Sequence, residues 1–208
     1  MKVIGFNGSP NLKGNTYQVL DIFFDELNKH GIETEIVNIG TKVIRGCVSC
    51  GTCFKTKDEK CVFDDEVNTY IQKMKESDGI ILASPVHFSG ITGTMKSFLD
   101  RVFYVSTANK NIFRHKVGSA LVVTRRTGGM TALNQLYNYI NYSEMIVPSS
   151  NYWNVIYGTN SGDINKDLEG LQIIKVLAKN MIWTLKNFEL SSVKEPEAEK
   201  KIITNFIK

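Results

Sequence analysis

The sequence is poor in several features that mark non-globular proteins. It has only 4 prolines among 208 residues, and its formal net charge is no more than +4. With 42% hydrophobic and 22% charged residues, it has the composition neither of a disordered chain nor of a collagen-like or low-complexity polymer. No run of five or more like charges occurs, so nothing indicates a nucleic-acid partner. The small positive excess favours anionic small molecules such as phosphates.

Long hydrophobic runs are absent as well. The longest, such as 79–83 and 118–123, fall far short of the roughly 20 apolar residues that span a bilayer. The first residues reach an Asn-Gly-Ser-Pro turn after only a few apolar positions, which is not typical of a signal peptide. We therefore expect a cytoplasmic protein without a membrane partner, in which thiols stay reduced.

Cysteine is scarce and confined to one stretch. The 4 cysteines are Cys47, Cys50, Cys53 and Cys61, in the pattern C-x2-C-x2-C-x7-C. In a cytosolic chain such clustering indicates metal or redox chemistry before disulfides. Thiolates at these close spacings are typical of iron–sulfur clusters, whereas structural zinc usually takes two C-x2-C pairs that lie further apart. Thiols without a metal are the remaining alternative.

Short β-branched runs alternate with amphipathic stretches along most of the chain. Strands are expected at residues 2–6, 33–39, 79–83, 117–124 and 145–147. Helices are expected where apolar residues recur at helical spacing. These stretches are residues 15–30, 64–77, 93–103, 131–142 and 165–188. The alternation predicts an α/β protein with a parallel sheet and helices on both faces.

The chain shows no internal repeat, flexible linker or break in composition, so we expect one domain over residues 1–190. Within it, residues 40–62 form a cysteine-rich insertion, and residues 191–208 follow as a charged tail or short helix. Four apolar residues at helical spacings are expected in the core. They are Met74, Phe98, Phe103 and Trp183.

The stretch 8–16 joins the first strand directly to the first helix. Ligands of parallel sheets bind beyond the carboxyl ends of the strands, so the loops after the first, third and fourth expected strands are candidate sites. In the first loop, free helix amides with Ser9, Asn15 and Thr16 as added donors indicate an anion site. It matches neither a Walker loop nor a G-x-G-x-x-G fingerprint. A polar turn with Asn15 as helix cap is the alternative.

Several short motifs occur in a defined order from this loop onwards. The first reads G-S-P-x-x-x-G-N-T over residues 8–16. The others are Ala83-Ser84-Pro85-Val86, Met95-Lys96-Ser97-Phe98-Leu99-Asp100-Arg101, Gly128-Gly129 and Tyr152-Trp153-Asn154. Together they resemble the flavodoxin-like NAD(P)H-dependent FMN reductase superfamily, over residues 1 to about 185. The cysteine stretch 46–53 is similar to the iron–sulfur flavoprotein branch of that superfamily.

The resemblance implies a flavodoxin-like three-layer sandwich with a five-stranded parallel sheet, which binds FMN through three loops. The first loop would hold the FMN phosphate with Ser9, Pro10, Gly14, Asn15 and Thr16. The second would lie beside the isoalloxazine ring with Ser84, Pro85, Val86, His87 and Phe88. The third would face the pyrimidine end of the ring with Thr124, Arg125, Arg126, Gly128 and Gly129.

Some of these residues admit two interpretations. His87 stands where relatives commonly carry Tyr, and it is either a flavin contact that can gain charge near neutral pH or an exposed loop residue. Arg125 and Arg126 would stabilise negative charge on the reduced flavin, meet the phosphates of a nicotinamide dinucleotide, or be solvated. Tyr152 and Trp153 would stack on the flavin or pack at a subunit interface.

The predicted function is that of an FMN-dependent NAD(P)H oxidoreductase. It would take a hydride onto flavin N5 and pass electrons to a small-molecule or protein acceptor. No catalytic residue is expected, because the cofactor carries the chemistry. The four cysteines would bind a [4Fe–4S] cluster in the same neighbourhood as the flavin, since their loop starts at the same edge of the sheet.

Two other functions fit the same residues. The protein could be a non-catalytic flavin and iron–sulfur electron carrier between protein partners, or a regulatory module stabilised by zinc. The resemblance also implies a homodimer or homotetramer, since relatives often complete the flavin site across an interface. Asp100 and Arg101 are expected to be structural ions that orient a loop or a subunit contact.

Overall fold

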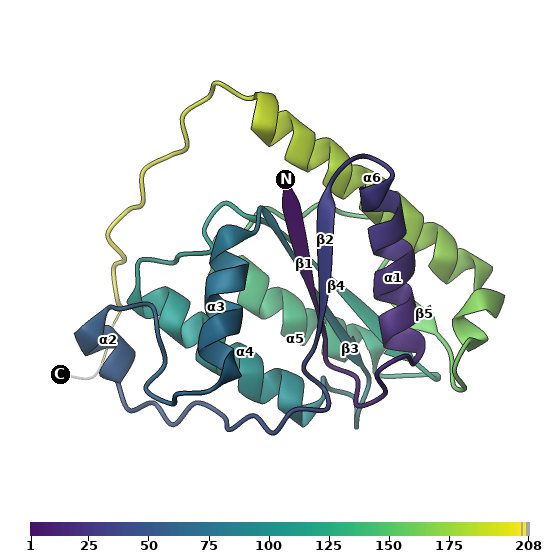
Figure 1. Cartoon of the computed structure of the whole chain (residues 1–208), viewed down its shortest axis with the longest axis horizontal. Coiled ribbons are helices and arrows are strands. Elements are labelled where there is room, and N and C mark those ends of the chain that lie inside the picture. Colours follow the sequence, from purple (N-terminus) through teal and green to yellow (C-terminus); the bar gives the residue numbers. More distant parts are fainter. Residues whose placement is uncertain (205, 207–208) are drawn as a thin grey trace.

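The computed structural model describes residues 1–204 and 206, which fold around a parallel β-sheet with helices on both faces (Figure 1). The strands of these residues are β1 (Lys2–Asn7), β2 (Glu33–Asn38), β3 (Gly79–Pro85), β4 (Val117–Thr124) and β5 (Val155–Tyr157). They are ordered β2-β1-β3-β4-β5, and every neighbouring pair is parallel. The expected α/β three-layer architecture is confirmed.

Helices lie against both faces of the sheet. They are α1 (Asn15–Asn28), α2 (Thr52–Thr56), α3 (Glu66–Glu76), α4 (Gly93–Ala108), α5 (Gly129–Tyr142), the 3-10 turn η1 (Asp163–Lys166) and α6 (Leu168–Leu190). Successive strand residues point to opposite faces. Val3 and Ile81 therefore pack with α1 and α6, whereas Ile4 and Ile80 pack with α3, α4 and α5.

The first helix shows how the sequence sets these layers. Val19, Leu20, Phe23 and Leu27 form one stripe of α1 and are fully buried against the sheet and α6. Burial of each such side chain stabilises the fold by about 1.5–3 kcal/mol. Gly31 then adopts a left-handed φ of 76°, which turns the chain from α1 towards β2.

The prediction of a fifth strand at residues 145–147 is wrong. That segment makes only an isolated bridge, between Ile146 and Val117 at the start of β4, and the regular fifth strand is β5. Pro148, which has no backbone N–H, interrupts the edge. In the gap, the Asn154 side-chain amide donates to the Ala120 carbonyl oxygen at 3.0 Å. One edge of the sheet is therefore made of two short backbone segments and a side chain.

The predicted core residues are confirmed with one exception. Met74, Phe98 and Phe103 are buried, but Trp183 is 69% exposed, so its assignment to the core is wrong. Met181 and Leu185 lie on the buried face of α6. Trp183 is two residues from each, and at 3.6 residues per turn it faces the opposite side.

The tail after α6 runs back across the molecule as an extended segment (Figure 1). Residues 191–204 and 206 form no helix or strand, so the short terminal helix is not found in them, and residues 205, 207 and 208 lie outside the described chain. Arg114 holds the tail by donating to the carbonyl oxygens of Pro196 and Glu197, at 2.9 and 3.4 Å.

Candidate functional site

Three loops meet at the carboxyl ends of β1, β3 and β4. The Gly8 N–H donates to the Ala83 carbonyl at 2.8 Å, and the Thr92 hydroxyl donates to the Gly8 carbonyl at 2.9 Å. The loop after β3 packs in turn against the loop after β4. Gly128 lies so close to Ser89 that a Cβ added to Gly128 would be only 2.9 Å from Ser89 Cα. The structure thus brings together all three loops that the sequence singled out.

The loop after β1 leads into a helix without a side-chain cap. Gly14 is the N-cap of α1, and the first turn of α1 contains no acidic residue. Ser9 and Thr16 are buried, whereas Pro10 is exposed. The Ser9 hydroxyl accepts a hydrogen bond from the Asn11 N–H at 3.1 Å. Free amides at a helix N-terminus are suited to bind an anion.

Asn15 binds a distant loop. Its Nδ2 donates to the Asn160 carbonyl at 2.8 Å, and its Oδ1 accepts from the Gly162 N–H at 2.8 Å. Gly158 lies so close that a Cβ there would be 2.7 Å from Asn15 Nδ2. Asn15 does not cap α1, so the prediction of a cap at Asn15 is wrong. Both polar ends of this side chain instead fasten the loop after β5 to the loop after β1.

The loop after β3 ends in a tight turn with an exposed aromatic tip. His87 and Gly90 exchange both backbone hydrogen bonds at 2.9 Å, and the two residues between them, Phe88 and Ser89, have left-handed φ values of 47° and 61°. Phe88 is fully exposed and His87 is exposed too. Left-handed non-glycine residues cost about 1–3 kcal/mol each and are concentrated at functional sites.

The start of that loop is buried at Ser84, half-buried at Pro85 and Val86, and hydrogen-bonded to its neighbours. The Ser84 hydroxyl accepts from the Thr92 N–H at 3.1 Å and donates to the Pro85 carbonyl at 2.9 Å. The Val86 N–H donates to the Val123 carbonyl at 2.9 Å, which continues the pairing of β3 with β4. Residues 84–86 therefore form a fixed base for the exposed turn.

The loop after β4 presents two cations. The buried Thr124 hydroxyl donates to the Thr127 carbonyl at 2.9 Å and closes the loop. Arg125 and Arg126 are exposed, and neither forms an ion pair with a carboxylate of residues 1–204 or 206. Gly128, with a φ of 85°, is the N-cap of α5. The two guanidinium groups are therefore available to an anionic ligand.

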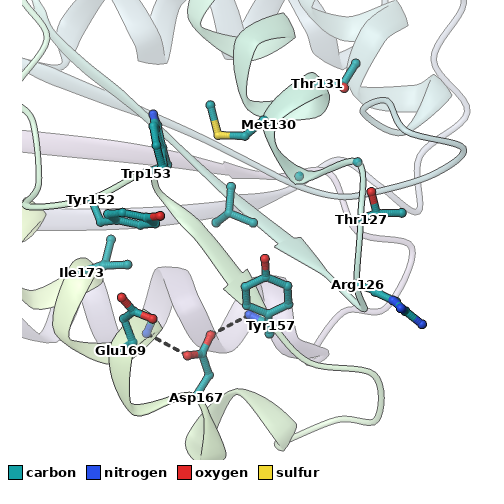
Figure 2. Close-up of a pocket in the computed structure, with 14 residues that line it drawn as sticks. Arg126, Thr127, Met130, Thr131, Tyr152, Trp153, Tyr157, Asp167, Glu169 and Ile173 are labelled. Atoms are coloured by element: carbon teal, nitrogen blue, oxygen red, sulfur yellow. Dashed lines mark hydrogen bonds between the residues drawn. The ribbon is translucent and has the colours of Figure 1, made fainter.

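A cavity of about 370 Å³ lies next to this loop, between the first turns of α5 and α6 and the edge strand β5 (Figure 2). It shares three of the residues predicted for the third loop, Arg126, Gly128 and Gly129, and is also lined by Thr127 between them. Tyr152 and Trp153 form its far wall, with ring centroids 4.5 Å apart and an interplanar angle of 68°. These two aromatics thus line a cavity beyond β4.

The floor of the cavity contains an acidic residue that sequence reasoning missed. Asp167 accepts from the Tyr157 N–H at 2.7 Å and from the Gly170 N–H at 2.9 Å (Figure 2). The Val155 N–H, on the same strand, donates to the Trp153 carbonyl at 2.7 Å. An Asp just before an apolar helical stretch is a capping signal, which could have located Asp167 as the N-cap of α6.

The four cysteines line one small pocket. Its other walls are mostly apolar, formed by Val48, Val62, Phe63, Tyr104 and Val105, together with Arg101. All four are free thiols. Burial raises the pKa of the Cys53 thiol, whereas the Thr52 hydroxyl lowers the pKa of the exposed Cys50 thiol. Among the described residues, no group of three or more Cys, His, Asp or Glu side chains is arranged to hold one metal ion.

Arg101 reaches this pocket from α4 and is only 1% exposed. Its Nε donates to Cys61 Sγ at 3.3 Å, and its two terminal nitrogens donate to both carboxylate oxygens of Asp65, at 2.6 and 2.8 Å. The expectation that Arg101 is a structural ion agrees with this ion pair, in which the arginine is buried and the aspartate is exposed. Arg101 is eight residues beyond Gly93, or about 12 Å along the helix, so the cysteine pocket is two turns from the three loops.

Comparison with known proteins identifies the family. The model of the NADPH-dependent FMN reductase family matches residues 1–160. The chain belongs to this family. As a member of the FMN reductase family, it is an FMN-binding, flavin-dependent oxidoreductase. None of the helices that the structure describes is long and apolar enough to cross a membrane.

Related sequences narrow the assignment within the FMN reductase family. An iron–sulfur flavoprotein of Methanocaldococcus jannaschii is 34% identical over 193 residues, which cover 89% of this chain and 98% of the relative. An iron–sulfur flavoprotein of Archaeoglobus fulgidus is 36% identical over 148 residues, which cover 71% of this chain and 66% of the relative. These matches place the chain in the iron–sulfur flavoprotein branch.

Solved structures agree on the fold. RosB, crystallised with the intermediate 8-demethyl-8-formylriboflavin-5'-phosphate, superposes with a TM-score of 0.72 at 17% identity, over 99% of this chain and 92% of that one. An archaeal flavodoxin gives a TM-score of 0.58 at 15% identity, over 89% of this chain and 99% of the flavodoxin. The fold is therefore flavodoxin-like.

Proposed function

We propose that this protein is an FMN-dependent NAD(P)H oxidoreductase that passes electrons onward through a [4Fe–4S] cluster on its four cysteines. When bound, FMN accepts a hydride at N5 and gives up electrons to an acceptor. The observation that carries the proposal is the meeting of the three loops, with an uncapped helix N-terminus in one and two arginines in another. The protein's part is to bind and orient, so no general acid or base is needed.

The loop after β1 fits a terminal phosphate. The first amides of α1 have no side-chain cap and no acidic neighbour in the first turn, so the helix dipole favours an anion there. Ser9 lies in this loop and Thr16 in the first turn of α1, and their hydroxyls would add donors. Asn15 would act indirectly, through the loop at 158–162 that it holds in place.

The other two loops fit a flat ring. Gly128 has no side chain, which lets the loops after β3 and β4 approach each other closely. Arg125 and Arg126 would lie at the pyrimidine end, where positive charge favours the reduced ring. The exposed ring of Phe88, held on a rigid turn, would cover part of the isoalloxazine or its substrate.

The cysteine pocket fits a cluster by the chemistry of its donors. Four thiols line one pocket, and four thiolates are the ligand set of a [4Fe–4S] cluster. Most of the other walls are apolar, and the polarity around a cluster is one of the factors that set its potential. Lys55, Lys57 and Lys60 in the same segment would offset the negative charge of the thiolates.

The remaining assignments extend the same proposal. Residues 1–190 would be the FMN-binding domain, with the insertion at 40–62 and the tail at 191–208. The electron donor would be NADH or NADPH, and the acceptor a small molecule or a protein. The protein would act in the cytoplasm as a homodimer or homotetramer.

The test begins with protein purified without oxygen. Its visible spectrum should show flavin and cluster together, with about four iron and four sulfide per chain. Stopped-flow mixing with NADH or NADPH should then bleach the flavin rapidly. If neither nucleotide bleaches the flavin, the result would favour the non-catalytic electron carrier. Zinc in place of iron would contradict the proposed cluster.

A further inference from the structure

We infer that Arg101 is a positioning residue for the cysteine segment: it ties the two ends of that segment together and donates an N–H to Cys61, which raises the reduction potential of the cluster. The inference rests on the proposed [4Fe–4S] cluster. It assigns a role to a residue that lies outside the three flavin loops, two helical turns from Gly93.

The guanidinium contacts the chain on both sides of the cysteines. Before them, Nη1 donates to the Arg45 carbonyl at 3.4 Å. After them, Nη2 donates to the Phe63 carbonyl at 3.3 Å, and both terminal nitrogens bind the Asp65 carboxylate. One planar side chain on α4 thus joins the strand-side and helix-side ends of a loop that has little regular structure of its own.

The end with the fourth cysteine is held especially firmly. The Asn68 side chain accepts from the Cys61 N–H at 2.8 Å and donates to the Cys61 carbonyl at 3.1 Å. Asp65 is the N-cap of α3 and accepts from the Val67 N–H at 3.1 Å. Cys61 is therefore fixed by its backbone from α3 and by its sulfur from Arg101, before any metal binds.

The bond to sulfur has an electronic consequence. Hydrogen bonds to the sulfurs, net charge and solvent exposure set the potentials of iron–sulfur clusters. An N–H that points at Cys61 Sγ stabilises negative charge on that ligand, and so favours the reduced cluster. Arg101 is 1% exposed and its charge is balanced by Asp65, so water does not replace this bond.

The decisive variant is Arg101→Lys, which keeps a positive charge but replaces the planar fork with a single ammonium group. Wild type and variant are reconstituted anaerobically with iron and sulfide. We expect the affinity for iron to fall about 10- to 100-fold, the usual effect of losing an outer partner of a metal ligand, and iron release to a chelator to become faster. The cluster midpoint potential should fall, while FMN content stays at the wild-type level.

Arg114→Lys is the matched control. Arg114 also binds one carboxylate, that of Glu144, and two backbone carbonyls, but it does so at the tail, away from the cysteines. Its replacement should leave iron release and cluster potential unchanged. A general effect of losing a partly buried arginine would appear in both variants.

A second variant covers the case in which Arg101→Lys does not fold, as judged by FMN content. Arg101→Met with Asp65→Asn removes both charges, so no unpaired ion stays buried and the local net charge is unchanged. A fall in potential then reports the lost bond to sulfur. If a folded variant shows the iron release and the cluster potential of wild type, the inference about Arg101 is wrong, but the proposed cluster is not contradicted. If the reconstituted wild-type protein contains no bound iron and sulfide, the proposal of a cluster is wrong, and the inference about Arg101 is wrong with it.

Discussion

The side-chain amide of Asn154 donates a hydrogen bond to the backbone carbonyl of Ala120, at the point where the edge of the sheet has no strand. The same amide donates to the Tyr137 hydroxyl at 2.8 Å, and Asn154 Oδ1 accepts from the Ser150 hydroxyl at 2.7 Å. One side chain that is 3% exposed thus replaces a strand residue and fixes the aromatic wall of the cavity.

Replacing Asn154 should destabilise the fold. Asn154→Ala leaves the Ala120 carbonyl without its side-chain donor and removes one of the partners of the Tyr137 and Ser150 hydroxyls. An unsatisfied buried polar group costs about 1–3 kcal/mol. Urea denaturation should show the free energy of unfolding lowered by that amount. Asn187→Ala, which removes an exposed amide from α6, should change it by no more than about 0.5 kcal/mol. Equal effects of the two changes would contradict the role of Asn154.

The phosphate assignment predicts a difference between two ligands. Thr16→Ala removes a donor next to the first amides of α1, and a hydrogen bond to a charged group is worth about 1.5–3 kcal/mol. The affinity for FMN should fall roughly ten- to a hundredfold, while that for riboflavin, which has no phosphate, should hardly change. Fluorescence titration measures both dissociation constants.

Two further variants separate direct from indirect contacts with the phosphate. Asn28→Ala, at the other end of α1, should affect neither ligand. Asn15→Ala releases the loop at 158–162, so it should weaken FMN binding and also lower the thermal midpoint. Equal weakening of FMN and riboflavin by Thr16→Ala would contradict the phosphate site.

The arginine loop predicts a change in flavin potential. Arg125→Ala or Arg126→Ala removes positive charge from the proposed pyrimidine end of the ring, so full reduction should become harder. For a two-electron couple, about 30 mV corresponds to about 1.4 kcal/mol, a plausible scale for one partly screened charge. Spectroelectrochemical titration measures the midpoint, with Lys179→Ala on the outside of α6 as control. If both arginine variants keep the wild-type midpoint potential, the arginines do not act on the flavin and would instead bind the nicotinamide donor.

The pair of Asp65 and Arg101 predicts a pH dependence of stability. Hydrogen bonds from the Arg101 guanidinium hold the pKa of the Asp65 carboxyl below its ordinary value of 3.8. The unfolded chain therefore takes up the proton first, so this contribution is fully present above about pH 4 and is lost as the pH falls further.

Asp65→Asn tests that contribution. It should lower the free energy of unfolding by about 1.5–3 kcal/mol at neutral pH. The difference from wild type should shrink as the pH falls below about 4, in urea titrations at several pH values. Asp21→Asn, at an exposed position of α1, should show no such trend. A difference that is constant across the acidic range would mean that the carboxylate charge is not what stabilises the pair.

The central layers could be predicted from the sequence. β1, β3 and β4 are runs of apolar residues followed by helices, and each run is buried on both faces, so local pattern and tertiary position agree. The three loops followed from strand order alone, because parallel strands end at one edge. The interrupted edge could not be predicted, because residues 145–147 have the composition of a strand. Only the hydrogen bond from the Asn154 side chain to the distant Ala120 carbonyl shows where the strand breaks.

The site contains similar long-range features. Asn15 and Asn160 are 145 residues apart, and no local pattern indicates that one holds the other. The contact of Arg101 with Cys61 joins two motifs that the sequence presents separately, one on a helix and one in a loop. Trp183 was misplaced because its spacing is helical, whereas burial depends on which side of α6 meets the sheet. The sequence motifs thus indicated candidate side chains, whereas their hydrogen-bond partners are set by the tertiary structure.

The hydrogen bonds of the β5 edge bear on how copies of this chain can associate. The Val155 and Tyr157 amides, which would accept an added strand, already donate to the Trp153 carbonyl and the Asp167 carboxylate. An edge strand whose outward N–H groups are already paired is a poor template for a neighbour's backbone, and native proteins protect their edge strands from such pairing. Contacts between copies on this side would therefore be made by side chains, and would be open to tuning by single substitutions.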